Sequence, residues 1–139
     1  MEWKKDNYII TDSKDNIDIE FIVNSLNQTY WAEGRPKQLI QNAINNSILL
    51  SLFCDNKQIG FTRIVSDFSC FAWICDVFVD KKYRGNGLGK FLMECATSHS
   101  STKVRTILLG TKDAHGLYEK YGFVKAEMMM KKIEYENLF

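Results

Sequence analysis

The chain has 139 residues, enough for one domain around one hydrophobic core, so we predict a single domain over residues 1–139. Apolar residues make up 45% of it and charged residues 25%, an ordinary globular composition. The 18 basic and 17 acidic residues leave a net charge of +1, which gives no electrostatic reason to expect nucleic acid or an anionic membrane as a partner. With no signal-peptide pattern and no apolar run long enough to cross a membrane, we expect a cytoplasmic protein.

The cysteines and histidines show no metal-binding spacing, so we expect no metal site. A disulfide framework is equally absent from the pattern, and free cysteine behaves as a small hydrophobe. We therefore expect four buried free thiols. They are Cys54, Cys70, Cys75 and Cys95.

Apolar residues at helical spacing predict two early helices, which follow a first strand near Tyr8. The helices cover Ile19–Leu26 and Leu39–Ile44, and Pro36 stands where the second one starts. The loop between them, Tyr30–Arg35, carries two aromatic residues and an arginine.

Three strands are predicted next. Ile48–Phe53 and Ile59–Val65 form a hairpin around a polar turn. The third run, Cys70–Val79, is apolar almost throughout except at Asp76, so we expect a central strand that is buried on both faces.

The remaining chain alternates helix and strand. We predict a helix over Leu88–Ala96, a strand over Val104–Leu109 and a short helix over Ala114–Tyr121 that Gly122 ends. The tail from Phe123 to Tyr135 reads as one or two closing strands, with Met128, Met129 and Met130 packed in them. This mixed order predicts an α/β or α+β domain with helices on both faces of one sheet.

The most informative segment is the end of the third strand and the glycine-rich turn after it. Gly85, Gly87 and Gly89 open the following helix, with Arg84 and Lys90 on either side. Glycine lets the backbone approach a ligand closely, and a helix N-terminus favours anions. A diphosphate fits this arrangement.

Glycine spacing alone leaves alternatives open. The turn could be structural only, or it could belong to a different nucleotide-binding protein. A Rossmann loop is less favoured because that fingerprint lies early in a βαβ unit with an acidic residue about 20 positions later. A P-loop is excluded because the Gly-Lys-Ser/Thr ending is missing.

Two motifs together resemble the GCN5-related N-acetyltransferase (GNAT) family. Arg84–Gly89, after Val77–Val79, resembles its acyl-CoA signature, and Ala114–Phe123 resembles its second signature. The resemblance extends from Tyr8 to Tyr135. It implies the GNAT-type fold, an α/β (α+β) arrangement with a mixed, mostly antiparallel central sheet that helices flank on both faces.

The resemblance also implies an acetyl-CoA site. In the family, backbone N–H groups of the glycine loop hold the pyrophosphate, which corresponds here to Arg84, Gly85, Asn86, Gly87, Leu88, Gly89 and Lys90. The pantetheine arm pairs with the strand segment that corresponds to Val77, Phe78 and Val79. A backbone N–H near Phe78 or Val79 would polarise the thioester carbonyl. Thr111 stands where the family often has an asparagine that binds pantetheine, and its hydroxyl can form similar bonds.

Two residues are candidates for the proton transfers. Tyr118 corresponds to the family tyrosine that protonates the departing thiolate; the alternative is an amphipathic core tyrosine. Asp76 is the carboxylate inside the apolar strand, so it is a candidate general base for the attacking amine. The equally weighted alternative is a structural carboxylate that holds a neighbouring loop or binds a cation.

The predicted function is therefore N-acetylation of a primary amine by direct attack on acetyl-CoA, on a small molecule or a peptide. By analogy, Tyr30, Trp31 and Arg35 would lie at the acceptor cleft, although a loop packed on the core explains them equally well. The alternative function that stays open is a non-catalytic CoA-binding regulatory module. Separately, the resemblance suggests a homodimer paired through the last strands.

Overall fold

The computed structural model describes residues 1–111 and 115–138 and divides into two compact units, Met1–Leu108 and Leu109–Phe139. Each unit has its own architecture, so the single domain over residues 1–139 stays a prediction. Within the part of the chain that is described, no helix has the length and apolar character needed to cross a bilayer.

The first unit is built on a six-stranded sheet with strand order β1-β2-β3-β4-β5-β6. β1 to β5 pair antiparallel with their neighbours, which confirms the mostly antiparallel sheet. The strands are β1 (Glu2–Lys5), β2 (Tyr8–Thr11), β3 (Ile48–Cys54), β4 (Lys57–Ser66), β5 (Phe71–Val79) and β6 (Thr106–Leu109). Where one N-terminal strand was expected there are two, because Asp6 adopts a left-handed φ of 53° and turns the chain into a hairpin.

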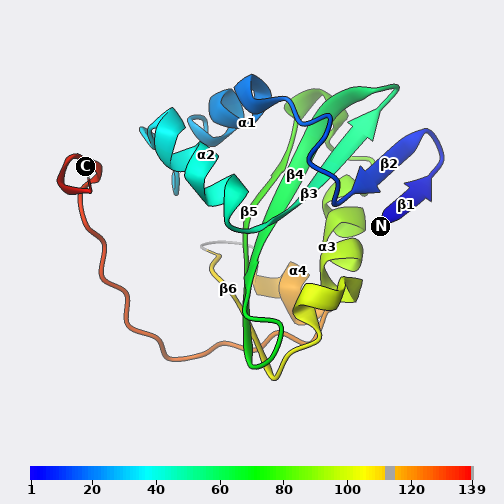
Figure 1. The fold of residues 1–139 in the computed structure, drawn as a ribbon. Coiled ribbons are helices and arrows are strands. Elements are labelled where there is room, and N and C mark those ends of the chain that lie inside the picture. Colours follow the sequence, from blue (N-terminus) through cyan, green and yellow to red (C-terminus); the bar gives the residue numbers. More distant parts are fainter. Residues whose placement is uncertain (112–114, 139) are drawn as a thin grey trace. The chain divides into compact units, whose positions relative to one another are not determined.

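Three helices cover this sheet, as predicted. α1 (Ile19–Leu26) and α2 (Lys37–Asn45) lie on one side of it and α3 (Leu88–Ser98) on the other (Figure 1). The Asp18 carboxylate caps α1 by accepting the Phe21 N–H at 3.0 Å. The apolar sides of α1 and α2 form one core cluster with the sheet. Its buried residues are Ile22, Leu26, Ala32, Ile40, Ile44, Leu49, Phe61 and Phe78.

The prediction that β5 is buried on both faces is wrong for one end of the strand. Ala72 and Ile74 are fully buried, but Phe71 and Trp73 between them are 38% and 42% exposed. Successive side chains of a strand point to opposite faces, and apolar character alone does not require burial. β5 is still central in hydrogen bonding, because it lies between β4 and β6.

The four cysteines are free thiols, as expected, but they are not all buried. Cys54 and Cys95 are buried and Cys75 is partly buried, whereas Cys70 is exposed. The reason lies in the turn before β5, where the Asp67 carboxylate accepts the N–H groups of Ser69, Cys70 and Phe71 at 2.8–3.0 Å. These bonds lower the pKa of Asp67, and they place Cys70 on the turn rather than in the strand.

The end of α3 joins the N-terminal hairpin through His99, a contact that sequence reasoning missed. The buried imidazole contacts the Asp12 carboxylate through Nε2 at 2.9 Å and the Ser101 hydroxyl through Nδ1 at 2.7 Å.

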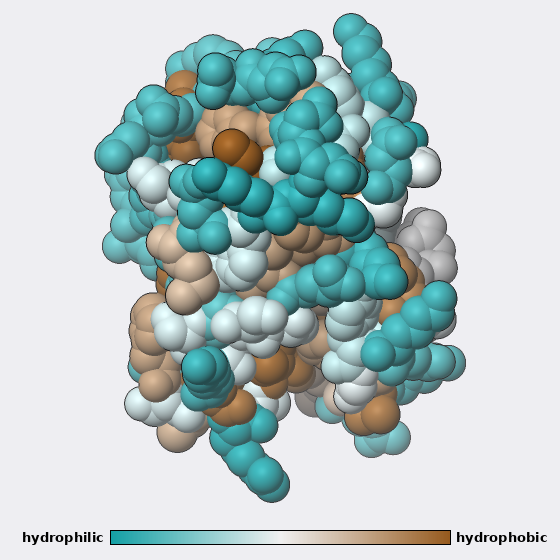
Figure 2. Space-filling view, turned by 90° about the vertical axis from the view of Figure 1, so that its right-hand side faces the viewer, coloured by the Kyte–Doolittle hydropathy of each residue, from teal (hydrophilic) through white to brown (hydrophobic). Residues whose placement is uncertain are grey.

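Figure 2 shows the face on this side of the molecule, where hydrophilic side chains cover most of the surface and small hydrophobic patches lie between them.

The second unit contains α4 (His115–Glu119) and a short 3₁₀ helix, Tyr135–Asn137. The turn after α4 closes at Gly122, as predicted: its φ is 86° and its N–H donates to Glu119 O at 3.1 Å. Residue Ala114 lies outside the described residues.

The closing strands predicted over Phe123–Tyr135 are wrong, because the residues between 123 and 134 adopt neither helix nor strand. Met128, Met129 and Met130 are 64%, 100% and 76% exposed, so their assignment to a packed strand is wrong as well. A strand-like sequence forms a strand only where another strand pairs with its backbone N–H and C=O groups.

Candidate active site

Backbone and side-chain hydrogen bonds made by residues 80–86 hold the glycine-rich turn in its conformation. At the end of β5, the Asp80 N–H donates to Ile59 O at 2.7 Å, and the Asp80 carboxylate accepts the Lys82 N–H at 3.0 Å. The 3₁₀ turn Lys81–Tyr83 follows, and the Asn86 side-chain amide donates to Tyr83 O at 2.9 Å. The loop that leads into α3 is thus fixed by local contacts.

Glycine is required in this loop for backbone conformation. Gly85 and Gly87 have φ values of 87° and 72°, in the left-handed region that other residues rarely adopt. Gly87 immediately precedes α3 and offers no side-chain cap to the N–H groups of the first helical turn. A Cβ added at Gly85, Gly87 or Gly89 would meet no heavy atom within 4 Å, so the space above these backbone groups is open. The arrangement suits an anion.

Arg84 places a cation at the start of this loop. Its Nε donates to Val79 O at 2.9 Å, and its guanidinium carbon lies 5.5 Å from the centre of the Phe78 ring. Lys90, on the first turn of α3, lies 3.9 Å from Glu94 in an exposed i,i+4 ion pair.

A groove of about 370 Å³ begins beside Arg84 and separates β5 from the loop after α1. Among the described residues, its lining is Gln28, Thr29, Tyr30, Trp31, Val77, Phe78, Val79, Lys81 and Arg84. The structure therefore brings the strand segment and the aromatic loop that were both predicted from sequence to the same groove. The lining residues just named include two cations and no carboxylate.

A β-bulge interrupts β5 at this groove. Phe61 pairs with Phe78 and Arg63 with Cys75, so Thr62 faces two residues, Asp76 and Val77. Asp76 takes up the extra length with a φ of 52°. Because a bulge leaves one residue outside the ladder, the regular pairing of β5 with β4 is interrupted at Asp76 and Val77, next to the groove wall. Sequence reasoning missed this bulge.

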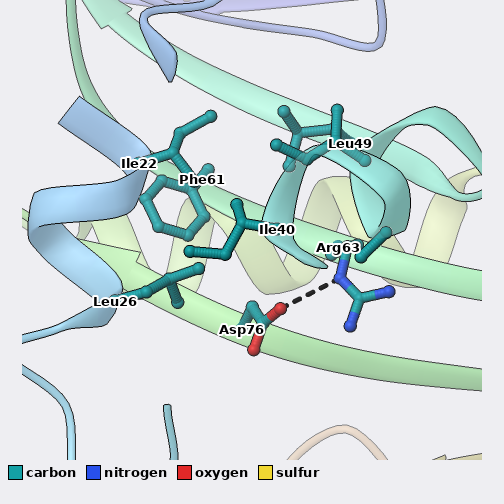
Figure 3. A pocket seen from close by; sticks show the side chains of 9 residues that line it. Ile22, Leu26, Ile40, Leu49, Phe61, Arg63 and Asp76 are labelled. Carbon is teal, nitrogen blue, oxygen red and sulfur yellow. Dashed lines mark hydrogen bonds and ion pairs between the residues drawn. The ribbon is translucent and has the colours of Figure 1, made fainter. Parts of the chain in front are cut away.

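The Asp76 carboxylate is buried and accepts bonds from three side chains. Trp31 Nε1 donates to Oδ1 at 3.2 Å, while Arg35 Nη1 and Arg63 Nε donate to Oδ2 at 3.0 Å and 2.9 Å. The Asp76 side chain is 5% exposed, and those of Arg35 and Arg63 are 15% and 14% exposed. Figure 3 shows the Arg63–Asp76 ion pair at the edge of an apolar cavity of about 10 Å³ between the helices and the sheet.

Comparisons with known proteins agree with this geometry. The sequence model of the acetyltransferase (GNAT) domain matches residues 45–125. An uncharacterized N-acetyltransferase, ycf52 of Pyropia yezoensis, is 30% identical in an alignment 128 residues long that covers 87% of this chain and 72% of the relative. The chain belongs to the GNAT family. Its activity class is accordingly that of an N-acetyltransferase.

Solved GNAT structures share the fold. A family member from Xanthomonas campestris pv. campestris is 35% identical with a TM-score of 0.87, over 92% of this chain and 94% of that one. A GNAT acetyltransferase from Elizabethkingia anophelis, solved with acetyl-CoA bound, has a TM-score of 0.66 at 22% identity, over 88% of this chain and 80% of that one. The GNAT-type fold predicted from the two motifs is thereby confirmed.

Sequence reasoning missed Arg63 at this site, as well as Gln28, Thr29 and Lys81 in the lining of the groove. A single arginine inside the apolar strand β4 was the available signal, because a charged residue on a buried strand needs a partner. Nothing local in the sequence indicates that this partner is Asp76, which lies 13 positions further along the chain.

Two of the predicted site residues, Tyr118 and Thr111, belong to the second unit. Tyr118 lies on α4 with its ring centre 6.4 Å from that of Phe123, and Thr111 lies shortly before α4. Their roles toward acetyl-CoA stay predictions.

Proposed function

We propose that the protein transfers the acetyl group of acetyl-CoA to a primary amine of a small molecule or a peptide. The observation that carries this proposal is the groove, because it joins the bulged end of β5 to the glycine loop at the N-terminus of α3. The family model matches residues 45–125 across the boundary of the two compact units, which supports one N-acetyltransferase domain over residues 1–139.

The glycine loop and the groove beside it fit acetyl-CoA in two ways. The left-handed glycines and the open space above them suit a pyrophosphate on the first turn of α3, with Arg84 and Lys90 supplying charge. Val77–Val79 line the groove and suit strand-like pairing with the pantetheine arm, and a backbone N–H near Phe78 or Val79 would polarise the thioester carbonyl. The acetyl-CoA bound to the Elizabethkingia relative supports this assignment.

The proposed reaction is a direct transfer. The neutral amine attacks the thioester carbonyl, a C–N bond forms and the C–S bond breaks. Tyr118 donates its phenolic proton to the departing sulfur, since a group with an ordinary pKa of about 10 can protonate a thiolate. The proton that the amine loses passes to water in the groove.

The charges along the groove limit the acceptor. Tyr30 and Trp31 offer aromatic surface, Lys81 adds a positive charge, and no carboxylate is among the described lining residues to attract a polycation. This lining favours an amine with an aromatic, apolar or anionic group over a polyamine.

Thermal unfolding with acetyl-CoA, NAD or ATP is the first test. Selective binding at a hundredfold excess over Kd adds about 2.7 kcal/mol, which raises Tm by roughly 9 °C for a chain of this size. Absence of a shift with saturating acetyl-CoA overturns the proposal, and a shift with ATP or NAD alone favours a different nucleotide-binding protein.

A panel of tyramine, glycine methyl ester, a peptide amine and spermidine then tests turnover by mass spectrometry. Tyr118→Phe is the matched variant, expected to lower kcat by about 10²-fold while acetyl-CoA binding is retained. A thermal shift without acetylation of any amine favours the non-catalytic CoA-binding module instead. The homodimer stays a prediction that light scattering tests.

A further inference from the structure

Asp76 is the buried carboxylate closest in sequence to the segment expected to bind pantetheine, and its environment differs from that of a proton acceptor. A general base must reach its proton directly or through one water. The described residues that line the groove include Val77 and Phe78 but not Asp76, which instead lines the small cavity between α1, α2 and the sheet (Figure 3).

The charges around Asp76 also oppose the approach of a protonated amine. Two guanidinium groups, those of Arg35 and Arg63, lie within 3.0 Å of the same oxygen, Oδ2. Both bonds are charge-assisted, so the negative charge on Oδ2 is engaged by two cations. The other oxygen, Oδ1, accepts the indole N–H of Trp31.

These three contacts connect the strand to the loop that forms the opposite wall of the groove. Arg63 belongs to β4 and fixes the carboxylate from the sheet side, and its Nη1 also lies 3.4 Å from Ser47 Oγ. Trp31 and Arg35 stand near the two ends of the loop Tyr30–Arg35, so a single carboxylate holds both ends. Trp31 is itself a lining residue of the groove, and Tyr30 packs edge-to-face on it with ring centres 5.1 Å apart.

We propose that Asp76 is a positioning residue: it holds the aromatic wall formed by Tyr30 and Trp31 in place at the groove and does not accept the proton of the amine. The bulge at Asp76 also helps to position this aromatic wall. The left-handed backbone of Asp76 turns its carboxylate toward Arg63 and Trp31, while Val77 and Phe78 continue along the groove. The part concerning the amine rests on the proposed function; the contact between Asp76 and Trp31 does not.

The first experiment measures Trp31 directly and needs no substrate. In a Trp3→Phe/Trp73→Phe background, Trp31 is the remaining tryptophan of the chain. Asp76→Asn should raise the acrylamide quenching constant of Trp31 about twofold or more, because an amide has one acceptor oxygen and cannot accept from the two arginines and from the Trp31 indole as the two carboxylate oxygens do. Asp67→Asn, which changes another hydrogen-bonded carboxylate, is the matched control and should leave quenching unchanged. Equal quenching in Asp76→Asn and its parent overturns the proposal.

The second experiment separates positioning from base catalysis with the panel amine that the wild type acetylates fastest. For a positioning residue, Asp76→Asn raises KM for the amine by about tenfold, the loss expected for one hydrogen bond, and the ratio of variant to wild-type kcat is constant from pH 7 to 9. A base role predicts a ratio that is low at pH 7 and recovers as the amine deprotonates by itself, which overturns the proposal.

Trp31→Phe keeps the proposal testable if Asp76→Asn does not fold. It retains an aromatic ring and removes the indole N–H, so KM for the amine should rise while acetyl-CoA binding is unchanged. An unchanged KM contradicts a role for the Asp76–Trp31 bond. If acetyl-CoA fails to bind even to the wild type, the proposed function falls, and the quenching experiment still decides whether Asp76 orders Trp31.

Discussion

Two loops beside the groove are held in place by different physical means. The glycine loop, Arg84–Lys90, presents backbone groups and is fixed by contacts between residues close in sequence, such as Asn86 with Tyr83. The aromatic loop, Tyr30–Arg35, presents side chains and is fixed by a carboxylate more than 40 positions away. At the glycine loop, backbone φ angles therefore determine the positions of the groups that face a ligand. At the aromatic loop, an ion pair determines the positions of these groups.

This difference separates what each loop contributes to an enzyme. Backbone recognition at a helix N-terminus suits a cofactor fragment that is always the same, here a pyrophosphate. Side-chain recognition changes with single substitutions, so the aromatic loop is the region where acceptor specificity can vary while the acetyl-CoA site is maintained.

The largest expected effect comes from removing the carboxylate that holds the aromatic loop. Asp76→Ala removes the carboxylate shared by Arg35 and Arg63 and leaves the partly buried Arg63 guanidinium without that counter-ion, which should cost about 3 kcal/mol or more of the free energy of unfolding. Urea denaturation measures this loss. Asp80→Ala, which removes only the cap of a short 3₁₀ turn, is the control and should cost about 1 kcal/mol. Equal losses for the two variants contradict the comparison.

Next in size are alanine substitutions in the glycine loop. Gly87→Ala forces a Cβ into a left-handed conformation and should destabilise the fold by about 1–2 kcal/mol. Gly89→Ala lies within α3 at ordinary helical φ and should stabilise it by about 0.5–1 kcal/mol. Both variants should weaken acetyl-CoA binding, measured by calorimetry. Full affinity in Gly89→Ala would contradict close approach of the ligand to this backbone.

The smallest expected effect on stability concerns a third loop, the turn before β5, which adds to the comparison of loops held by local and by distant contacts. There the Asp67 carboxylate is held by backbone N–H groups, mainly that of Phe71, and these bonds lower its pKa below 3.8. A lowered folded-state pKa means that the stabilisation is present above pH 3.8 and is lost as pH falls through the folded-state value. Asp67→Asn should therefore be slightly less stable than wild type at pH 6, with the difference vanishing in strong acid. A difference that grows below pH 3.8 would contradict this sign.

Sequence reasoning succeeded where structure depends on local signals. The helices α1, α2 and α3, the hairpin of β3 and β4 and the glycine loop follow from periodicity, turn residues and a motif whose φ angles only glycine adopts readily. The two GNAT signatures also allowed the overall fold to be predicted, because together they constrain the order of the helices and strands.

The sequence could not reveal features that depend on distant partners. The Asp76–Arg63–Trp31 contacts join three segments, and the bulge at Asp76 depends on how β5 pairs with β4. The prediction of strands in the tail was wrong for a related reason. Met128–Met130 have a strand-like sequence, but a strand forms only where another strand pairs with it. His99 likewise acquires its partner Asp12 only through folding.

The unequal burial of the cysteines has a practical consequence for chemical labelling. Burial raises the pKa of the Cys75 thiol to about 11 and that of Cys95 to about 12, and it also raises the pKa of the buried Cys54 thiol. All three thiols therefore remain protonated and unreactive near neutral pH. Cys70 sits exposed on its turn. A maleimide dye should therefore attach at one place in the native protein, providing a fluorescent reporter without mutagenesis. The same thiol adds a background to any Ellman-type assay of released CoA, which Cys70→Ser would remove.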